Sequence, residues 1–281
     1  MLDIILDTLI DAAKLIPFLF LTYLAMEYLE HRTGSKAQQL VKRAGKWGPV
    51  WGGILGALPQ CGFSAAASNF FAGRVISLGT LLAIYLSTSD EMLPILISER
   101  APIAMIGRIL FAKMVIGAVA GLLIDMLFAG KQAEHEHIHD LCEHDHCHCE
   151  EGIVRSAFNH TMQITFFILL VTFALNLVIH FVGEDTLAGL ILNRPVIGPL
   201  LAGVVGLIPN CAASVIITQL YLEQAMSVGA MMSGLLVGAG IGLLVLFRVN
   251  HDKKQNIKIV GLLYFVGVIA GIVIDLFLTG I

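Results

Sequence analysis

Two cysteines lie in matching polar interruptions of otherwise apolar sequence. Cys61 belongs to Gly56–Ser64 (GALPQCGFS), and Cys211 belongs to Gly206–Ser214 (GLIPNCAAS). In both stretches a proline and an amide residue precede the cysteine, and proline breaks a helix because it lacks an N–H donor and clashes with the preceding turn. A cysteine at the start of the next half-helix meets free N–H groups that favour the thiolate. Thiolates bind thiophilic ions such as Zn²⁺ and Cu⁺.

If the two breaks meet near the middle of a membrane, their side chains form one site. The substrate-binding residues predicted there are Gln60, Cys61, Ser64, Asn210, Cys211 and Ser214, with the two sulfurs as metal ligands. The alternative is that both cysteines are small apolar fillers at tight turns. Their recurrence in the same Pro-(Gln/Asn)-Cys context favours a role in binding.

A second polar interruption, Ser87–Glu91 (STSDE), adds Ser89, Asp90 and Glu91 to the candidate site. Carboxylates inside a membrane are costly and usually mark an ion path or a proton relay. The alternative is a hydrated helix end near the outer surface. Two further acids, Asp125 and Asp275, lie near the ends of apolar runs, and we expect them to cap helices or to make contacts between the halves of the chain.

A polar segment in the middle of the chain is rich in nitrogen and sulfur ligands. Its candidate metal ligands are His135, His137, His139, Cys142, His144, His146, Cys147, His148 and Cys149. Tracts of this composition bind metals, although the spacing is not that of a structural zinc finger. A solvated acidic loop is the alternative. We expect the segment to capture or sense metal in the cytoplasm, where thiols stay reduced.

The composition sets the class of protein that carries these residues. Hydrophobic residues make up 57% of the chain, charged residues 14%, and the mean hydropathy is +0.84. Values this apolar indicate an all-α integral membrane protein with the lipid bilayer as its surroundings, and no nucleic-acid partner is expected. Five cysteines argue against a disulfide framework. We see no cleavable signal peptide, and a homo-oligomer is compatible with the sequence.

The two cysteine stretches are part of a longer internal repeat with an offset of 150 residues. It runs from Gly48 and Gly198 to Gly130 and Gly280 without a shift in register. The sequence therefore predicts a first transmembrane repeat at 1–130, a His/Cys-rich linker at 131–152 and a second transmembrane repeat at 153–281. Paired interruptions in two halves of a membrane protein point to the binding site of a transporter.

Loop charges predict that the two repeats are inverted. The basic loop before Pro49 and the basic segment Arg248–Lys258 are assigned to the cytoplasm, whereas their counterparts in the other repeat are not basic. The apolar runs lie at Ile4–Leu29, Pro49–Phe71, Val75–Ile97, Ile103–Phe128, Phe158–Val182, Val196–Leu222, Ala225–Phe247 and Lys258–Leu278.

Inversion needs an odd number of crossings per repeat, so one of the four runs should be re-entrant. We place the re-entrant run at Pro49–Phe71, folded back at Pro59–Gly62, and expect its counterpart in the second repeat to be re-entrant as well. The alternative is a turn at Ser87–Glu91. The prediction is six crossings plus two re-entrant segments with broken helices at the Pro-(Gln/Asn)-Cys motifs.

The chain resembles the family of ten-transmembrane heavy-metal exporters, which is related to the arsenic permeases and is also labelled a manganese transporter family. The resemblance covers essentially the whole chain and rests on Leu58–Ala66 (LPQCGFSAA), Ile208–Ser214 (IPNCAAS) and the His-rich middle segment. It implies a transporter. Its ten spans differ from our six crossings unless the halves of broken helices are counted separately.

Together these observations predict a secondary transporter, not an enzyme, in the cytoplasmic membrane of a bacterium or archaeon. It would export a thiophilic heavy metal or metalloid ion, with protons as the coupling ion and no permanently bound cofactor. The ion would bind at the midplane between the repeats, while the linker captures or senses metal. Two alternatives are a small-anion transporter with a metal-sensing linker and an intramembrane thiol oxidoreductase that uses Cys61 and Cys211.

Overall fold

The computed structural model describes residues 47–57, 61–89, 92–128 and 196–277, together with isolated positions within 16–24 and 154–173. Every regular element in these ranges is a helix. The first set comprises α2 (Gly48–Gly56), α3 (Cys61–Ala72), α4 (Leu78–Ser87), α5 (Met92–Ser98) and α6 (Ile103–Phe128). The second comprises α10 (Ile197–Gly206), α11 (Cys211–Leu222), α12 (Val228–Val237), α13 (Ile241–Val249) and α14 (Lys253–Phe277).

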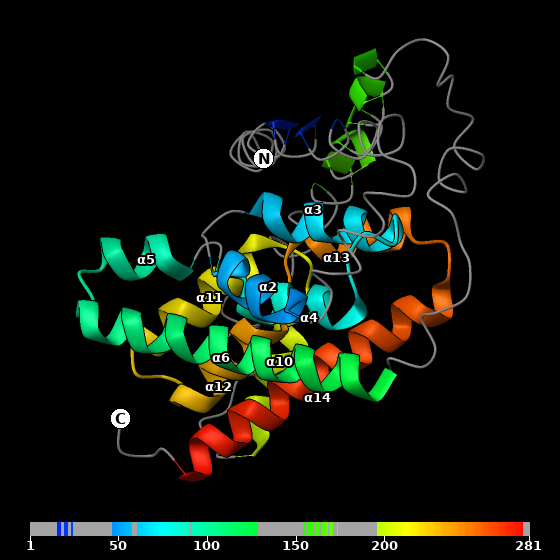
Figure 1. Ribbon diagram of the computed structural model, residues 1–281. Coiled ribbons are helices and arrows are strands. Elements are labelled where there is room, and N and C mark those ends of the chain that lie inside the picture. Colours follow the sequence, from blue (N-terminus) through cyan, green and yellow to red (C-terminus); the bar gives the residue numbers. More distant parts are fainter. Residues whose placement is uncertain are drawn as a thin grey trace.

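The sequence offset reappears in these helix bounds, because each helix of the second set begins and ends within one residue of the position 150 residues after its counterpart. In both sets two short helices are followed by two more and then by one long helix (Figure 1). Four segments of the described chain are long and apolar enough to cross a bilayer. They are Leu78–Ser98, Ile103–Phe128, Val228–Val249 and Lys253–Phe277. The protein is therefore an all-helical, multi-pass membrane protein.

Helices end at both of the positions that the sequence offered as alternatives. The first break separates α2 from α3 and α10 from α11, where a proline precedes the cysteine. The second separates α4 from α5, where the Thr88 hydroxyl donates to the Ile84 carbonyl at 2.8 Å and takes up a helix-terminal acceptor. The corresponding break between α12 and α13 contains glycine, with Gly240 at φ 54°. Whether either broken segment is re-entrant remains a prediction.

The last helix starts earlier than its apolar run predicts. The apolar run begins at Lys258, whereas α14 begins at Lys253. The carboxylate of Asp252 accepts hydrogen bonds from the backbone N–H groups of Lys254 at 3.0 Å and Gln255 at 3.1 Å. This cap satisfies donors of the first turn, so a polar turn is added before the apolar part of the helix.

The two central helices are α4 and α12. Every residue of α4 is buried, and α4 packs between α2 and α6. Every residue of α12 except Val228 is buried, and α12 packs between α10 and α14. Glycines spaced four apart allow this close approach: a Cβ on Gly121 would lie 2.4 Å from the Gly79 carbonyl, and one on Gly271 would lie 2.5 Å from that of Gly229. These glycines therefore let the helices touch.

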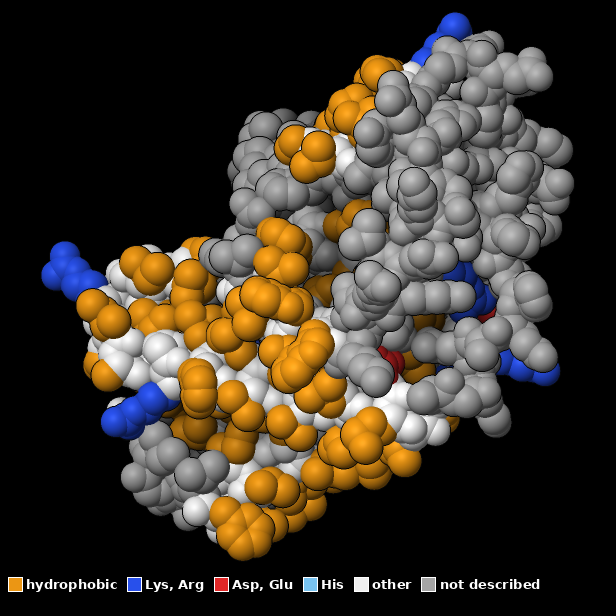
Figure 2. Space-filling model, viewed as in Figure 1, with side chains coloured by type: hydrophobic (Ala, Val, Ile, Leu, Met, Phe, Trp, Pro, Cys, Tyr) orange, Lys and Arg blue, Asp and Glu red, His pale blue; other side chains and the backbone are white. Residues whose placement is uncertain are grey.

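Large apolar side chains cover the outward faces of the two long helices. Exposed examples include Phe111 and Leu123 on α6 and Phe265 and Leu276 on α14. Figure 2 shows a broad orange band across the described part of this face, with lysine and arginine side chains at its ends. A band of this kind is what a helix needs where lipid replaces water.

The two sets of helices meet through crossed pairs. Helix α3 packs on α13, and α5 packs on α11, so each pair joins one helix from either set. The two long helices run in opposite directions in Figure 1. The end of α6 lies beside the start of α14. The Lys258 ammonium group is 3.7 Å from the centroid of the Phe128 ring.

Candidate functional site

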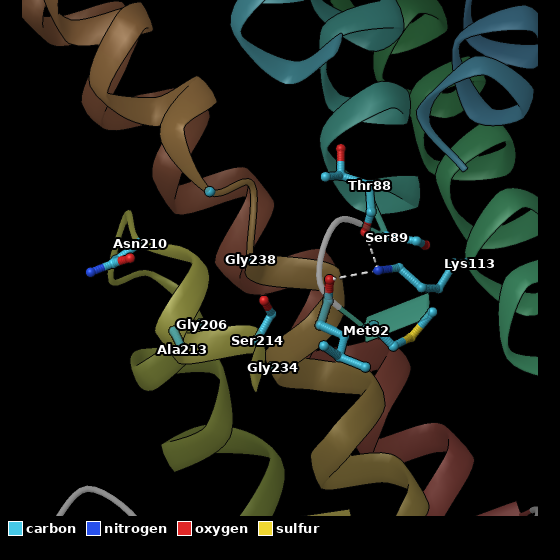
Figure 3. A pocket seen from close by; sticks show the side chains of 12 residues that line it. Thr88, Ser89, Met92, Lys113, Gly206, Asn210, Ala213, Ser214, Gly234 and Gly238 are labelled. Atoms are coloured by element: carbon cyan, nitrogen blue, oxygen red, sulfur yellow. Dashed lines mark hydrogen bonds between the residues drawn. The ribbon is translucent and has the colours of Figure 1, made fainter. Parts of the chain in front are cut away.

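A small cavity lies between the two sets of helices, where several of them end. It offers about 20 Å³ to the centres of water-sized molecules, which is room for about one water. The first set contributes Thr88, Ser89, Met92 and Lys113, and the second contributes Asn210, Ala213, Ser214 and Leu235 together with the glycines 206, 234, 238 and 240. Figure 3 shows these side chains around the cavity.

The helix breaks position this lining. Thr88 is the C-cap of α4, and Met92 is the first residue of α5. On the opposite side, Asn210 precedes α11, and Gly240 is the N-cap of α13. The amino ends of α11 and α13 carry a partial positive charge, whereas the carboxyl ends of α4 and α12 carry a partial negative charge. A ligand in the cavity can thus meet donors and acceptors of the backbone.

Among the lining residues that the structure describes, Lys113 is the charged one, and its side chain is completely buried. Its Nζ donates to the carbonyl of Thr88 and, at 3.0 Å, to the carbonyl of Leu235. Figure 3 shows both bonds, one to each set of helices. Lys113 is not among the residues predicted from the sequence. The available signal was a single lysine in the middle of the apolar run Ile103–Phe128, with Leu263 at the corresponding position 150 residues later.

The structure brings three of the predicted site residues together. Ser89, Asn210 and Ser214 all line the cavity. In Figure 3, Ser214 lies between α11 and the ribbon that carries Gly238. Ser89 is 1% exposed and its hydroxyl donates to the Ser87 carbonyl at 3.0 Å. These three residues come from Ser87–Glu91 and Gly206–Ser214, two of the three polar interruptions in the sequence.

Ser64 lies elsewhere, in the packed crossing of α3 with α13. A Cβ on Gly242 would lie 2.7 Å from the Cβ of Ser64. Next to it, the Ser68 hydroxyl donates to the Gly242 carbonyl at 2.7 Å, and the Tyr85 hydroxyl donates to the same carbonyl at 3.1 Å. Tyr85 corresponds to Leu235 in the internal repeat. Among the lining residues that the structure describes, the second cysteine stretch is represented by Gly206, Asn210, Ala213 and Ser214.

Several predicted residues lie outside the described part of the chain. This holds for Gln60, Asp90, Glu91 and the whole His/Cys-rich segment, and for the side chains of Cys61 and Cys211. The backbone of both cysteines is described, and each is the first residue of its helix, as predicted. Among the side chains that the structure describes, no group of three His, Cys, Asp or Glu residues could hold a metal ion.

The two symmetric acids have the structural role expected of them. Asp125 accepts hydrogen bonds from the Ser77 hydroxyl at 2.6 Å and the Gly79 N–H at 2.7 Å. In the second set, Asp275 repeats both contacts with Ser227 and Gly229. Each carboxylate caps a central helix from a neighbouring long helix of the same set.

A family model described as "Putative, 10TM heavy-metal exporter" matches residues 1–174 and 109–244 of the chain. The chain belongs to this family. The match confirms the family suspected from the cysteine stretches. No curated protein and no solved structure matches the chain. The description of the family names ten transmembrane segments. The ranges 47–128 and 196–277 contain ten helices with described bounds. Among these ten, only α6 and α14 are each long enough to cross ~30 Å of hydrocarbon on their own.

Proposed function

We propose that this protein is a secondary transporter that exports a thiophilic heavy metal or metalloid ion and binds it in the cavity between the two sets of helices. The observation that carries the proposal is the position of this cavity, at the ends of discontinuous helices from both sets. Transporters place their substrates at such points, because broken helices present free backbone groups within the membrane. Cys211 is the first residue of α11, directly after the lining residue Asn210.

Alternating access would follow from movement of one set of helices against the other. Two observations support an inverted arrangement of the repeats: the long helices α6 and α14 run in opposite directions, and the end of α6 lies beside the start of α14. The predicted sidedness requires those two ends to share the cytoplasmic face, since the His/Cys-rich segment follows α6 directly. Protons are proposed as the coupling ion, and the segment 131–152 as the place where metal is captured.

The test is a flux measurement with purified protein in liposomes. We expect efflux of at least one of arsenite, Cu⁺ and Zn²⁺, and we expect Asn210→Leu to reduce it by filling the cavity with an apolar side chain. Glu223→Gln, at an exposed residue directly after α11, is the control for handling and reconstitution. Liposomes in which none of the three ions moves, while the control protein is folded, would rule out the proposed substrate class.

A transporter for small anions is the second candidate, and Lys113 is the observation that favours it. A buried lysine and the amino ends of α11 and α13 would attract a negative charge, and no described residue of the lining is acidic. A competition panel separates the candidates. Inhibition by small oxyanions without inhibition by Cu⁺ or Zn²⁺ would select the anion transporter.

A further inference from the structure

The two crossings that join the sets of helices occupy equivalent places in the internal repeat, because α3 corresponds to α11 and α13 to α5. At the α3–α13 crossing Gly242 lies against Ser64, so close that a Cβ on the glycine would be 2.7 Å from the Cβ of the serine. The counterparts of these two residues, Met92 and Ser214, both line the cavity. One crossing is therefore packed at the point where the other borders a cavity.

A pair of buried hydroxyl groups holds the packed crossing together. The hydroxyl oxygens of Ser68 on α3 and Tyr85 on α4 are 2.7 Å apart, and both side chains are fully buried. Ser68 donates to the Gly242 carbonyl at 2.7 Å, and Tyr85 donates to the same carbonyl at 3.1 Å. Each hydroxyl has a single proton, so either of them can make the bond to Gly242 when the other is removed. The pair thus ties α13 to two helices of the first set.

The α5–α11 crossing has no equivalent of this pair among the residues that the structure describes. Leu235 stands at the position equivalent to Tyr85, and a leucine side chain has no hydrogen-bond donor. Thr218 stands at the position equivalent to Ser68, and its hydroxyl donates to the Ser214 carbonyl of its own helix at 2.7 Å. The larger Met92 replaces Gly242. The hydroxyl pair therefore stabilises one of the two crossings and not the other.

The two crossings lead to opposite ends of the long helices. Helix α13 ends four residues before the start of α14, and α5 ends five residues before the start of α6. Because the start of α14 lies beside the end of α6, α13 leads to the end that the predicted sidedness assigns to the cytoplasm, and α5 leads to the outer end. In Figure 1, α5 lies at the left, and α13 lies further to the right, on the side where α14 begins.

We propose that the α3–α13 crossing is the cytoplasmic gate of the transporter, and that the hydroxyl pair of Ser68 and Tyr85 locks it on the Gly242 carbonyl. The inference rests on the proposed function, because a gate has a role only in a transporter. In a transporter of inverted repeats, one half closes as the other opens when the binding site changes its access. Breaking the bonds to Gly242 lets α3 and α13 part, while α5 and α11 close over the cavity.

The first experiment observes the gate without a transport substrate, by amide hydrogen exchange of the purified full chain. Ser68→Ala combined with Tyr85→Phe removes both donors to Gly242. We expect exchange to become faster in α3 and α13, which form the locked crossing, and slower in α5 and α11, which form the other. Changes of opposite sign are required, because a shift between two states opens one crossing as it closes the other.

Tyr264→Phe is the matched control, because it removes a tyrosine hydroxyl that donates to the Leu200 carbonyl at 3.1 Å within the second set. It should leave exchange at both crossings unchanged. Tyr85→Phe alone keeps the test decisive where the double variant does not fold, and it should give smaller changes in the same directions. Faster exchange at both crossings, or no change at either, would show that the hydroxyl pair only contributes to packing, and would overturn the proposal.

The second experiment tests whether the lock controls access from the cytoplasm. Uptake is measured in inverted membrane vesicles, whose outer surface is the cytoplasmic face, with arsenite, Cu⁺ and Zn²⁺ as probes. Apparent affinity rises in proportion to the fraction of protein that is open to the ion. We therefore expect KM to fall by about fivefold in the double variant, which is the factor that one ordinary hydrogen bond supplies.

An unchanged KM for a probe that the wild type transports would overturn the gating role. A wild type that moves none of the three probes would count against the proposed function, while the exchange measurement still decides whether the hydroxyl pair locks the crossing.

Discussion

Ser77 donates a hydrogen bond of 2.6 Å to the carboxylate of Asp125 and so joins the start of α4 to the end of α6. Ser227 and Asp275 make the same bond at 2.7 Å in the second set of helices. In both places the carboxylate also accepts the backbone N–H two residues after the serine. The central helices are therefore capped by a neighbouring helix, and each cap is made twice in the molecule.

Removing either carboxylate should destabilise the protein by a similar amount. Asp125→Ala and Asp275→Ala each remove two hydrogen bonds to a charged acceptor, and we expect a loss on the order of 3 kcal/mol from the free energy of unfolding. Denaturant unfolding in detergent measures this loss. Glu223→Ala, which removes an exposed carboxylate, should unfold like the wild type. A stable Asp275→Ala protein would show that the cap contributes little.

The glycines that follow the capping serines should not tolerate a methyl group. A Cβ at Gly79 would lie 2.1 Å from the Gly121 carbonyl, and one at Gly229 would lie 2.2 Å from the Gly271 carbonyl. Because both obstacles are backbone atoms, Gly79→Ala and Gly229→Ala should force the helices apart and lower the melting midpoint.

Gly107→Ala and Gly261→Ala are the matched controls, because nothing lies within 4 Å of a Cβ at either position. In these helix interiors alanine should be neutral or stabilise by about 0.5–1 kcal/mol. Equal losses at all four positions would mean that packing does not distinguish them.

The two cysteines should differ in importance for transport. Cys211 begins the helix whose first turn lines the cavity, whereas the first turn of α3 packs against α13. Serine is nearly isosteric with cysteine but is a poor ligand for soft metals. We therefore expect Cys211→Ser to lose most metal flux and Cys61→Ser to lose less, measured in liposomes at matched protein amounts.

The double variant distinguishes a shared site from two separate roles. If both sulfurs bind one ion, the double variant should be little worse than Cys211→Ser alone, because residues that act as a unit are not additive. Wild-type flux in the double variant would reduce both cysteines to turn residues.

Deleting the His/Cys-rich segment should change affinity or regulation and leave the transport step itself in place. Removal of 134–150 takes away nine candidate nitrogen and sulfur ligands, while the described cavity draws its lining from 88–113 and 206–240. We expect weaker apparent affinity for metal with measurable flux in liposomes. A well-folded deletion variant with no flux would place this segment in the transport path.

The sequence determined the class of this protein and the position of its main landmarks. Apolar composition predicts membrane helices because a buried backbone without water must satisfy its own hydrogen bonds. Proline predicts the break before Cys61 and the break before Cys211 because it removes a donor wherever it stands. Both are local properties of the chain. The internal repeat is read from the sequence as well, and it reappears in the bounds of α4 and α12.

Tertiary structure decided which of the repeated residues share a cavity. The sequence treats Ser64 and Ser214 alike, but Ser214 lines the cavity, whereas Ser64 packs against Gly242 at the crossing of α3 and α13. Lys113 gained its role in the same way, since its two acceptors lie 25 and 122 residues away along the chain. Such contacts depend on how helices cross in space, so a local pattern of residues does not contain them.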